Sequence, residues 1–294
     1  MVVVQLTGGL GNQMFQYAAA KSLAIRKKTS LILDISSFYR TEIPDLEVVR
    51  DFALQKFLGV TEESININNL ALNDQFSFLE DKKIDKLLPR FKRSTFREKF
   101  FHFDSTFFKT KNSVYLVGIW QSPKYFETVQ NEILKSFKFR NEIINRVEAK
   151  ANEMRNSNSL SIHVRRGDYL RKPIILDWHG VMSKEYYLNA FNLIKTKTKI
   201  DKVYYFSDEP DWVASELIPH IPGEIVSVEV SQSQYEDFYL LQSCQHQILA
   251  NSSFSWWAAY LNTNPNKIII APKRWFHKAP NNTKDLFPES WITI

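Results

Sequence analysis

The sequence predicts an α/β protein built from two consecutive parallel-sheet units. Its 294 residues are ample for two domains of about 150 residues each. A short buried strand, a glycine-rich loop, a helix and a second strand open the chain within residues 2–34, as at the start of a parallel sheet. The same alternation resumes at residue 160, after the polar run NSNS. We therefore place the domain boundary at this run, which gives domains 1–155 and 156–294.

The first half supplies one set of alternating elements. Apolar residues recur at helical spacing after the glycine loop, from Met14 to Ile25, and short runs of Val, Ile and Leu precede and follow them. We expect strands at 2–6, 31–34 and 114–120, and helices at 12–26, 124–137 and 141–155. The stretch 35–115 alternates Phe-rich and Lys-rich segments and receives no detailed assignment.

The second half repeats this rhythm. Ser183 stands directly before a helical pattern and is a suitable N-cap. We expect strands at 160–164, 203–206, 224–230, 247–250 and 267–271, and helices at 183–195, 211–217, 235–243 and 254–261. Since ligands of such sheets bind beyond the carboxyl ends of strands, we expect the functional residues at those ends.

Composition excludes several classes of protein. A single cysteine, Cys244, allows neither an internal disulfide nor a zinc site of cysteines. The net charge of +6 suits an anionic partner such as a diphosphate or a membrane surface, but is too dispersed to indicate nucleic acid. The locally basic stretch 92–99 is a solvated surface or a contact with a membrane or acidic substrate. No run is long and apolar enough for a signal peptide or a membrane span, so we expect a soluble or peripheral protein.

The first chemical motif is GGLGNQ at residues 8–13. Glycines let the backbone approach a ligand closely, and the start of a helix favours an anion. The motif lacks the third glycine of the dinucleotide fingerprint and the Lys-Ser/Thr of a phosphate-binding P-loop. It is either a structural turn or a ligand loop in which Asn12 and Gln13 offer hydrogen bonds. In an alternative reading as an oxidoreductase, Asp34 would bind the ribose of a dinucleotide.

The second motif is SIHVRRGDY at residues 161–169, where a strand leaves the sheet. One of the two guanidinium groups, of Arg165 or Arg166, could grip a phosphate with two parallel hydrogen bonds, while an acidic neighbour holds the other. Alternatively, one or both arginines form ion pairs with Asp168.

The third motif is FSDEPDW at residues 206–212. Its acids, among them Asp208, could simply favour the N-terminus of a short helix, or they could bind a divalent metal. The sequence has no Asp-x-Asp pair, which metal-dependent sugar transferases usually carry.

The fourth motif joins YEDF at 235–238 to NSSFSWW at 251–257. Asp237 could accept hydrogen bonds from guanine. Ser252 and Ser253 begin a helix, where they either cap it or help its amides to hold a diphosphate. The tandem tryptophans favour core packing.

These segments resemble the α-1,2-fucosyltransferases. The similarity lies in GGLGNQMFQYA at 8–18, HVRRGDY at 163–169 and NSSFSWWAAY at 251–260, with further matches in GIWQSPKYF at 118–126 and HGV at 179–181. The matches occur in order along nearly the whole chain.

The resemblance implies a GT-B fold, in which two Rossmann-like domains face a central cleft. It implies metal-independent, inverting transfer of L-fucose from GDP-L-fucose to O2 of a terminal β-galactoside, with no cofactor. Eukaryotic members carry an N-terminal membrane anchor, which we do not find here, so we expect a bacterial, cytoplasmic enzyme, with at most contact to the inner face of the membrane. The alternatives are another GDP-sugar-dependent glycosyltransferase with a different acceptor, or a non-catalytic nucleotide-sugar-binding module.

The resemblance also assigns residues to roles. Arg165 would contact the β-phosphate, His163 and Asp237 would face the guanosine, and Asn12 would approach the reacting region. We expect the catalytic residues to be Arg165, Asp168, Asn12 and His179. The expected donor-binding residues are Gly9, Gly11, Gln13, His163, Arg166, Ser207, Asp208, Asp237, Ser252, Ser253 and Phe254. On the acceptor side we expect Trp120, Gln121 and Asp177.

Overall fold

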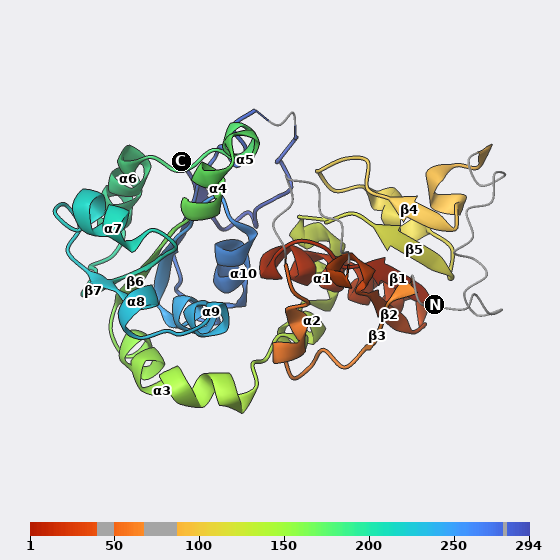
Figure 1. The fold of residues 1–294 in the computed structure, drawn as a ribbon, viewed down its shortest axis with the longest axis horizontal. Coiled ribbons are helices and arrows are strands. Elements are labelled where there is room, and N and C mark those ends of the chain that lie inside the picture. The colour runs from red at the N-terminus through yellow and green to blue at the C-terminus, as the bar shows by residue number, and fades with distance from the viewer. Residues whose placement is uncertain (40–49, 68–86, 279–280) are drawn as a thin grey trace. The chain divides into compact units, whose positions relative to one another are not determined.

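The computed structural model describes residues 1–39, 50–67, 87–278 and 281–294, with Asp168, Val228 and Glu229 described by their backbone alone. The chain divides into two compact units (Figure 1). The first comprises Met1–Lys138 with Asn281–Pro288, and the second comprises Phe139–Pro280 with Glu289–Ile294.

This division lies between Lys138 and Phe139, earlier than the polar run at 156–159. Helix α3 (Asn141–Arg155) therefore belongs to the second unit, whereas the sequence placed it in the first. The reason is packing between segments far apart in the chain. Tyr239 donates a hydrogen bond to Glu148 of α3 over 2.7 Å, and the ring of Phe139 lies 5.7 Å from that of Phe238.

The first unit contains a five-stranded, wholly parallel sheet in the order β3-β2-β1-β5-β4. Its strands are β1 (Val2–Gln5), β2 (Leu31–Asp34), β3 (Glu63–Ile65), β4 (Thr95–Arg97) and β5 (Val114–Val117). Its helices are α1 (Leu10–Lys27) and α2 (Gln130–Ser136). The first three residues of β1 are fully buried, as expected for the central strand of a parallel sheet.

Several predicted elements of this unit are confirmed, and two are corrected. The predicted strand 114–120 ends at Val117, and Trp120 lies outside it in a left-handed backbone conformation with φ +55°. The predicted helix 124–137 is α2 preceded by single turns of 3-10 helix, the first of which, η8 (Pro123–Tyr125), begins at a proline. Strands β3 and β4 arise from the stretch that the sequence left unassigned.

The second unit contains a six-stranded parallel sheet in the order β11-β10-β9-β6-β7-β8. Its strands are β6 (Ser159–Val164), β7 (Lys202–Ser207), β8 (Glu224–Ile225), β9 (His246–Ile248), β10 (Ile269–Ala271) and β11 (Ile292–Thr293). Its helices after α3 are α4 (Gly167–Arg171), α5 (Pro173–His179), α6 (Lys184–Lys195), α7 (Pro210–Trp212), a π-helical turn (Val213–Leu217), α8 (Val226–Glu229), α9 (Gln234–Ser243) and α10 (Ser253–Leu261).

Read from its central strand, this order is 3-2-1-4-5-6, the arrangement of the Rossmann fold. Ser183 caps α6 as expected, by accepting a hydrogen bond from the backbone N–H of Tyr186. The predicted strand 224–230 is corrected, because only its first two residues pair with β7 and α8 follows at once.

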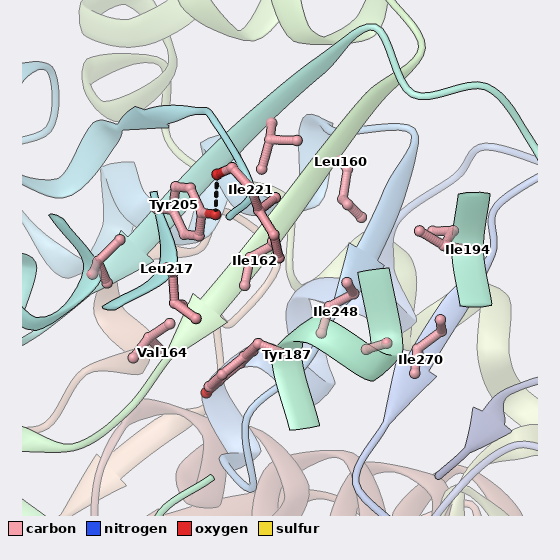
Figure 2. Packing of buried hydrophobic residues seen from close by; sticks show 13 residues of the cluster. Leu160, Ile162, Val164, Tyr187, Ile194, Tyr205, Leu217, Ile221, Ile248 and Ile270 are labelled. Carbon is pink, nitrogen blue, oxygen red and sulfur yellow. Dashed lines mark hydrogen bonds between the residues drawn. The ribbon is translucent and has the colours of Figure 1, made fainter. Parts of the chain in front are cut away.

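The core of the second unit forms where β6 meets α6 (Figure 2). Leu160, Ile162 and Val164 of β6 are fully buried against Tyr187 and Ile194 of α6, among others. The hydroxyl of the buried Tyr205 donates to the carbonyl of Ile221 over 2.6 Å, so that its polar atom is satisfied inside an apolar cluster. This packing makes β6 a rigid support for whatever follows its carboxyl end.

Each sheet has one point where the strand order reverses, between β1 and β5 in the first unit and between β6 and β9 in the second. Loops leave in opposite directions at such a point and open a crevice for ligands. The motifs at 8–13, 118–126, 163–169 and 251–257 all follow these four strands. Within the described residues, no helix is both long enough and apolar enough to cross a membrane.

Candidate active site

An arginine held by an aspartate lies at the carboxyl end of β6. Nη1 of Arg165 lies 3.0 Å from Oδ2 of Asp208, which follows β7, and the backbone N–H of Arg166 donates to Oδ1 over 2.9 Å. A Cβ built on Gly167 would lie 3.0 Å from that same Oδ2, so the carboxylate packs tightly against the glycine. Asp208 thus orients Arg165, because both of its oxygens face the segment 165–167.

The neighbouring arginine has a different environment. The guanidinium of Arg166 lies over the ring of Trp212, with Cζ 4.0 Å from the ring centroid. This is a cation–π contact, and it fixes Arg166 against α7. The sequence offered Asp168 as the partner of the arginines, and its side chain lies outside the described residues. Among the described side chains, Asp208, which lies far from Arg165 in sequence, forms an ion pair with it.

A buried histidine stands beside this pair. His163 is 7% exposed, and its Nδ1 has no hydrogen-bond partner within the described part of the chain. Burial and the charge of Arg165 lower the pKa of His163 to about 3, against the opposing effect of Asp208. The imidazole is therefore neutral at physiological pH. Its ring lies 5.5 Å from that of Phe254, which in turn meets Phe238 edge-on at 5.2 Å.

A network of serines surrounds Asp237 on α9. Its Oδ1 accepts hydrogen bonds from the hydroxyls of Ser227, over 3.0 Å, and Ser231. Burial raises the pKa of Asp237, while the two serine hydrogen bonds oppose that rise. Ser207 joins the network through its backbone, since its N–H donates to Ser227 over 3.2 Å, while its hydroxyl accepts from the N–H of Glu209. The hydroxyl of Ser207 is thus used within the chain.

The N-terminus of α10 follows β9, the strand next to β6. Ser252 occupies the N-cap position, but its side chain caps nothing, so the capping alternative is not what the fold uses. The first backbone N–H groups of a helix have no partner inside the helix, so this terminus, with Ser253 and Phe254, is suited to an anion. Trp256 and Trp257 are fully buried, which confirms that they belong to the core.

A stack of rings leads away from Arg165. Cζ of Arg165 lies 5.9 Å from the ring centroid of Tyr169, whose ring stacks on His179 at 5.1 Å. His179 borders a cavity of about 450 Å³ between α5, α6 and the strand end at Pro272. Asp177, expected on the acceptor side, is exposed and pairs with Lys278.

Asn251 is a buried residue to which the sequence analysis gave no role. Its Nδ2 donates to the carbonyls of His179, over 2.9 Å, and Gly180, and its buried Oδ1 has no partner within the described residues. It ties the α5–α6 loop to the end of β9. Its position directly after a predicted strand, and ahead of the serines, was a signal that could have identified it.

The first unit carries a second polar group at its own reversal point. Asn12 lies in the first turn of α1, after β1, and Gln121 follows β5. Nε2 of Gln121 donates to Oδ1 of Asn12 over 2.9 Å, whereas the buried Oε1 of Gln121 has no partner in the described chain. Gly8 has φ +74°, and a Cβ built on Gly9 would meet nothing within 4 Å, so the loop is open to a ligand there.

Three expected site residues of this unit are buried in the fold. The side chain of Gln13 is fully buried: its Nε2 donates to the carbonyls of Gly8 and Asp51, and its Oε1 accepts from the N–H of Ala53, each over 2.8 Å. Gly11 is buried within α1, and Trp120 is fully buried. Gln13 and Trp120 therefore shape the loops rather than face a ligand.

Two alternatives depended on acidic residues. Asp34, the ribose ligand of the oxidoreductase reading, is buried, and its oxygens accept hydrogen bonds from Ser36 and from the Tyr115 hydroxyl over 2.7 Å. In the described residues, no group of three or more His, Cys, Asp or Glu side chains is arranged to hold a metal ion.

Comparison with known proteins gives a consistent result. The family model "Glycosyl transferase family 11" matches residues 1–294. The O-antigen biosynthesis glycosyltransferase WbnK of Escherichia coli is 32% identical, over 98% of this chain and 99% of WbnK. An Escherichia coli alpha-1,2-colitosyltransferase is 29% identical, over 100% of this chain and 99% of its own. Galactoside alpha-(1,2)-fucosyltransferase 2 of Oryctolagus cuniculus is 25% identical, over 100% of this chain and 77% of its own.

Solved structures resemble the fold. FUT1 of Arabidopsis thaliana, as a mutant in complex with GDP, has a TM-score of 0.52 at 14% identity, over 93% of this chain and 71% of that one. Fucosyltransferase NodZ from Bradyrhizobium has a TM-score of 0.50 at 16% identity, over 88% of this chain and 92% of NodZ. The two parallel-sheet α/β domains expected of a GT-B fold are thus confirmed. Because the family model spans every residue and the bacterial relatives match nearly end to end, the chain is a glycosyltransferase and belongs to glycosyl transferase family 11.

Proposed function

We propose that this enzyme transfers L-fucose from GDP-L-fucose to O2 of a terminal β-D-galactoside, with inversion and without a metal ion. The observation that carries the proposal is the Arg165–Asp208 pair, which lies beside the start of α10 at the reversal point of a Rossmann-type sheet. The similarity of the whole of this chain to galactoside alpha-(1,2)-fucosyltransferases supports the choice of sugar and linkage.

The second unit offers one group for each part of the donor. Asp237 accepts the N–H groups of guanine, which have the donor geometry that a carboxylate favours. His163 and Phe254 form an apolar, neutral wall for the guanosine. Arg165 takes the β-phosphate, while the amides of Ser252, Ser253 and Phe254 take the remaining diphosphate oxygens.

The chemistry follows from where charge develops. Fucose is β-linked in the donor, so attack from the opposite face gives an α-linkage. As the bond to GDP lengthens, negative charge grows on the β-phosphate, and a guanidinium already held in place by Asp208 stabilises it without reorganising. The sugar meanwhile acquires oxocarbenium character, which lowers the demand on the nucleophile.

A base then takes the proton from the acceptor hydroxyl. Asp168 and His179 are the candidates for this role. His163 is a poor choice, because its depressed pKa makes it a weak base. On the acceptor side we place Asn12 and Gln121, whose free amide atoms can accept from and donate to a sugar hydroxyl.

The experiment that tests the donor and linkage is a transfer assay on the purified protein. GDP-fucose with lactose should release GDP and give a product whose NMR spectrum shows an α-1,2 linkage. Parallel reactions with UDP-galactose and UDP-glucose are the controls. Transfer from the UDP-sugars alone would overturn the proposal, and tight GDP binding without turnover on any glycan would favour a binding module.

A second donor is favoured by one observation. The alpha-1,2-colitosyltransferase relative matches the chain along its full length at 29% identity. Colitose is fucose without its 3-hydroxyl, so GDP-colitose would fit the same phosphate and guanine contacts. A competition between GDP-fucose and GDP-colitose decides which sugar the enzyme prefers.

We further propose a cytoplasmic enzyme that contacts the inner face of the membrane through the stretch 92–99, where Lys92, Arg97 and Lys99 are exposed. Their charge suits anionic lipid headgroups. Cell fractionation tests the location. Co-sedimentation with phosphatidylserine vesicles, compared with phosphatidylcholine vesicles, tests the contact.

A further inference from the structure

One half-buried carboxylate in the first unit binds two consecutive backbone amides. Glu98 directly follows β4, and its Oε2 accepts a hydrogen bond from the N–H of Ile119 over 2.7 Å. Its Oε1 accepts from the N–H of Trp120 over 3.0 Å. These amides belong to the loop after β5, so Glu98 connects an edge strand to the loop at the reversal point of the sheet.

The loop that Glu98 holds is under conformational constraint. Trp120 has φ +55°, a left-handed backbone that a bulky residue rarely adopts. A Cβ on Gly118 would lie 2.4 Å from Cβ of Glu98, so only glycine allows the glutamate to approach this closely. Such an unfavourable backbone conformation persists only where surrounding contacts hold it in place. Here the two hydrogen bonds to Glu98 hold it.

The constrained loop fixes the position of Gln121. This side chain is 7% exposed and reaches Oδ1 of Asn12 over 2.9 Å. The carbonyl of Gly118 also accepts from Nε2 of Gln16 on α1, over 3.1 Å. A rotation of the peptides at 119 and 120 would therefore move Gln121 away from Asn12 and would alter the start of α1.

We propose that Glu98 is a positioning residue for the reaction, because its ionised carboxylate locks the Trp120 turn and thereby holds Gln121 against Asn12. The inference deepens the proposed function and rests on it for its activity readout. Glu98 itself touches no substrate in this account, and it acts only through the loop.

The charge state of Glu98 is set by its surroundings. Burial raises its pKa to about 7, although the hydrogen bonds from Ile119 and Trp120 oppose the rise. Tyr125 lies near it, and burial and then the charge of Glu98 raise the pKa of that tyrosine, which also feels the charges of Arg90 and Asp104, an ion pair at 2.9 Å. A protonated carboxyl keeps only one good acceptor oxygen, so one of the two amides then loses its partner.

The test compares Glu98→Gln with Glu127→Gln, which removes an exposed acid of the same unit. Glutamine has one acceptor oxygen, so it mimics the protonated state at every pH. We expect kcat of Glu98→Gln to fall by about 10- to 100-fold, as for a small displacement of a reacting group. We also expect it to lose the rise of wild-type kcat between pH 6 and 8. GDP affinity and the Glu127→Gln variant should match the wild type.

A double-mutant cycle separates positioning from simple destabilisation. If Glu98 acts through Gln121, Glu98→Gln should add little to the loss caused by Gln121→Ala. Multiplicative losses, or a pH profile of kcat that Glu98→Gln leaves unchanged, would overturn the inference.

Amide NMR gives a readout that does not depend on turnover. The signals of Ile119 and Trp120 should titrate near pH 7 in the wild type and not in Glu98→Gln. If the wild type fails to transfer fucose while these signals titrate, the proposed function fails and the clamp stands. If the signals do not move, the clamp fails.

Discussion

In the first unit, Gln13, Gln16 and Asp34 lie near the carboxyl ends of β1 and β2, and each is buried with hydrogen-bond partners inside the chain. In the second unit, Nδ1 of His163 and Oδ1 of Asn251 lie at the equivalent ends of β6 and β9. They are equally buried, but without partners in the described residues. An unsatisfied buried polar atom costs stability, so these two atoms, which lie at neighbouring strand ends, are candidates for contact with a ligand.

The polar side chains at the strand ends therefore have different roles in the two units. In the first unit, most of these polar side chains form hydrogen bonds that hold loops in place, and mainly the Asn12–Gln121 pair is left to contact a ligand. The second leaves several groups open around Arg165, which is what a highly charged nucleotide requires. Two parallel sheets of different strand order thus support, in the first unit, mainly a rigid loop and, in the second, mainly a binding site.

The largest expected effect is at Arg165. Arg165→Lys keeps the charge but removes the planar fork, so kcat should fall by about 10²–10³-fold while the protein remains folded. Arg166→Lys is the matched control, because its guanidinium is stacked on Trp212. We expect a smaller loss there, with a lower melting temperature. Steady-state kinetics and circular dichroism measure both, and equal losses in the two variants would remove the distinction between the arginines.

Variants of Asn12 and Gln13, two neighbouring side-chain amides, should distinguish a role in activity from a role in stability. Gln13→Ala removes three hydrogen bonds to the backbone, one of them from the buried N–H of Ala53, and should lower the free energy of unfolding by about 2–3 kcal/mol. Asn12→Ala should leave stability nearly unchanged and lower kcat by about tenfold or more. Urea unfolding and kinetics on both variants check this, and the reverse pattern would contradict the assignment.

His163 in the second unit and Glu98 in the first should contribute to stability with opposite dependence on pH. The pKa of His163 is depressed to about 3 from 6.5, so the unfolded chain binds more protons across that interval. The contribution of His163 to stability is present above pH 6.5 and is lost as pH falls. The pKa of Glu98 is raised from 4.5 to about 7, so its protonation favours the folded state as pH falls through that range. Melting temperatures of His163→Gln and Glu98→Gln across pH 4–8 should deviate from the wild type with opposite slopes. Parallel slopes would refute this.

The smallest expected effect is on the transfer rate when EDTA removes divalent metal ions. If Arg165 and the start of α10 supply the positive charge, EDTA should leave the transfer rate unchanged, and added Mg²⁺ or Mn²⁺ should not raise it. A rate that falls with EDTA and recovers with one of these ions would assign the role of Arg165 to a metal instead.

The sequence by itself determined the α/β class, the parallel strands and the segments that follow them. These depend on local signals: apolar runs, helical periodicity, and glycines or serines at the starts of helices. The helix after the glycine loop, the Ser183 cap and the buried tandem tryptophans were all predictable in this way. The motifs also identified Arg165 and Asn12 as candidates, because charge and amide groups at strand ends are visible in one dimension.

Only the tertiary structure decided which groups meet. Asp208, from the end of the neighbouring strand, pairs with Arg165, Gln13 turns inward to Asp51 and Ala53, and Glu98 binds the amides of a loop two elements away. No local pattern encodes these contacts, because the order of strands in a sheet is set by packing over the whole domain. A side chain's partner, and therefore its pKa and its role, depends on which strand end lies next to its own.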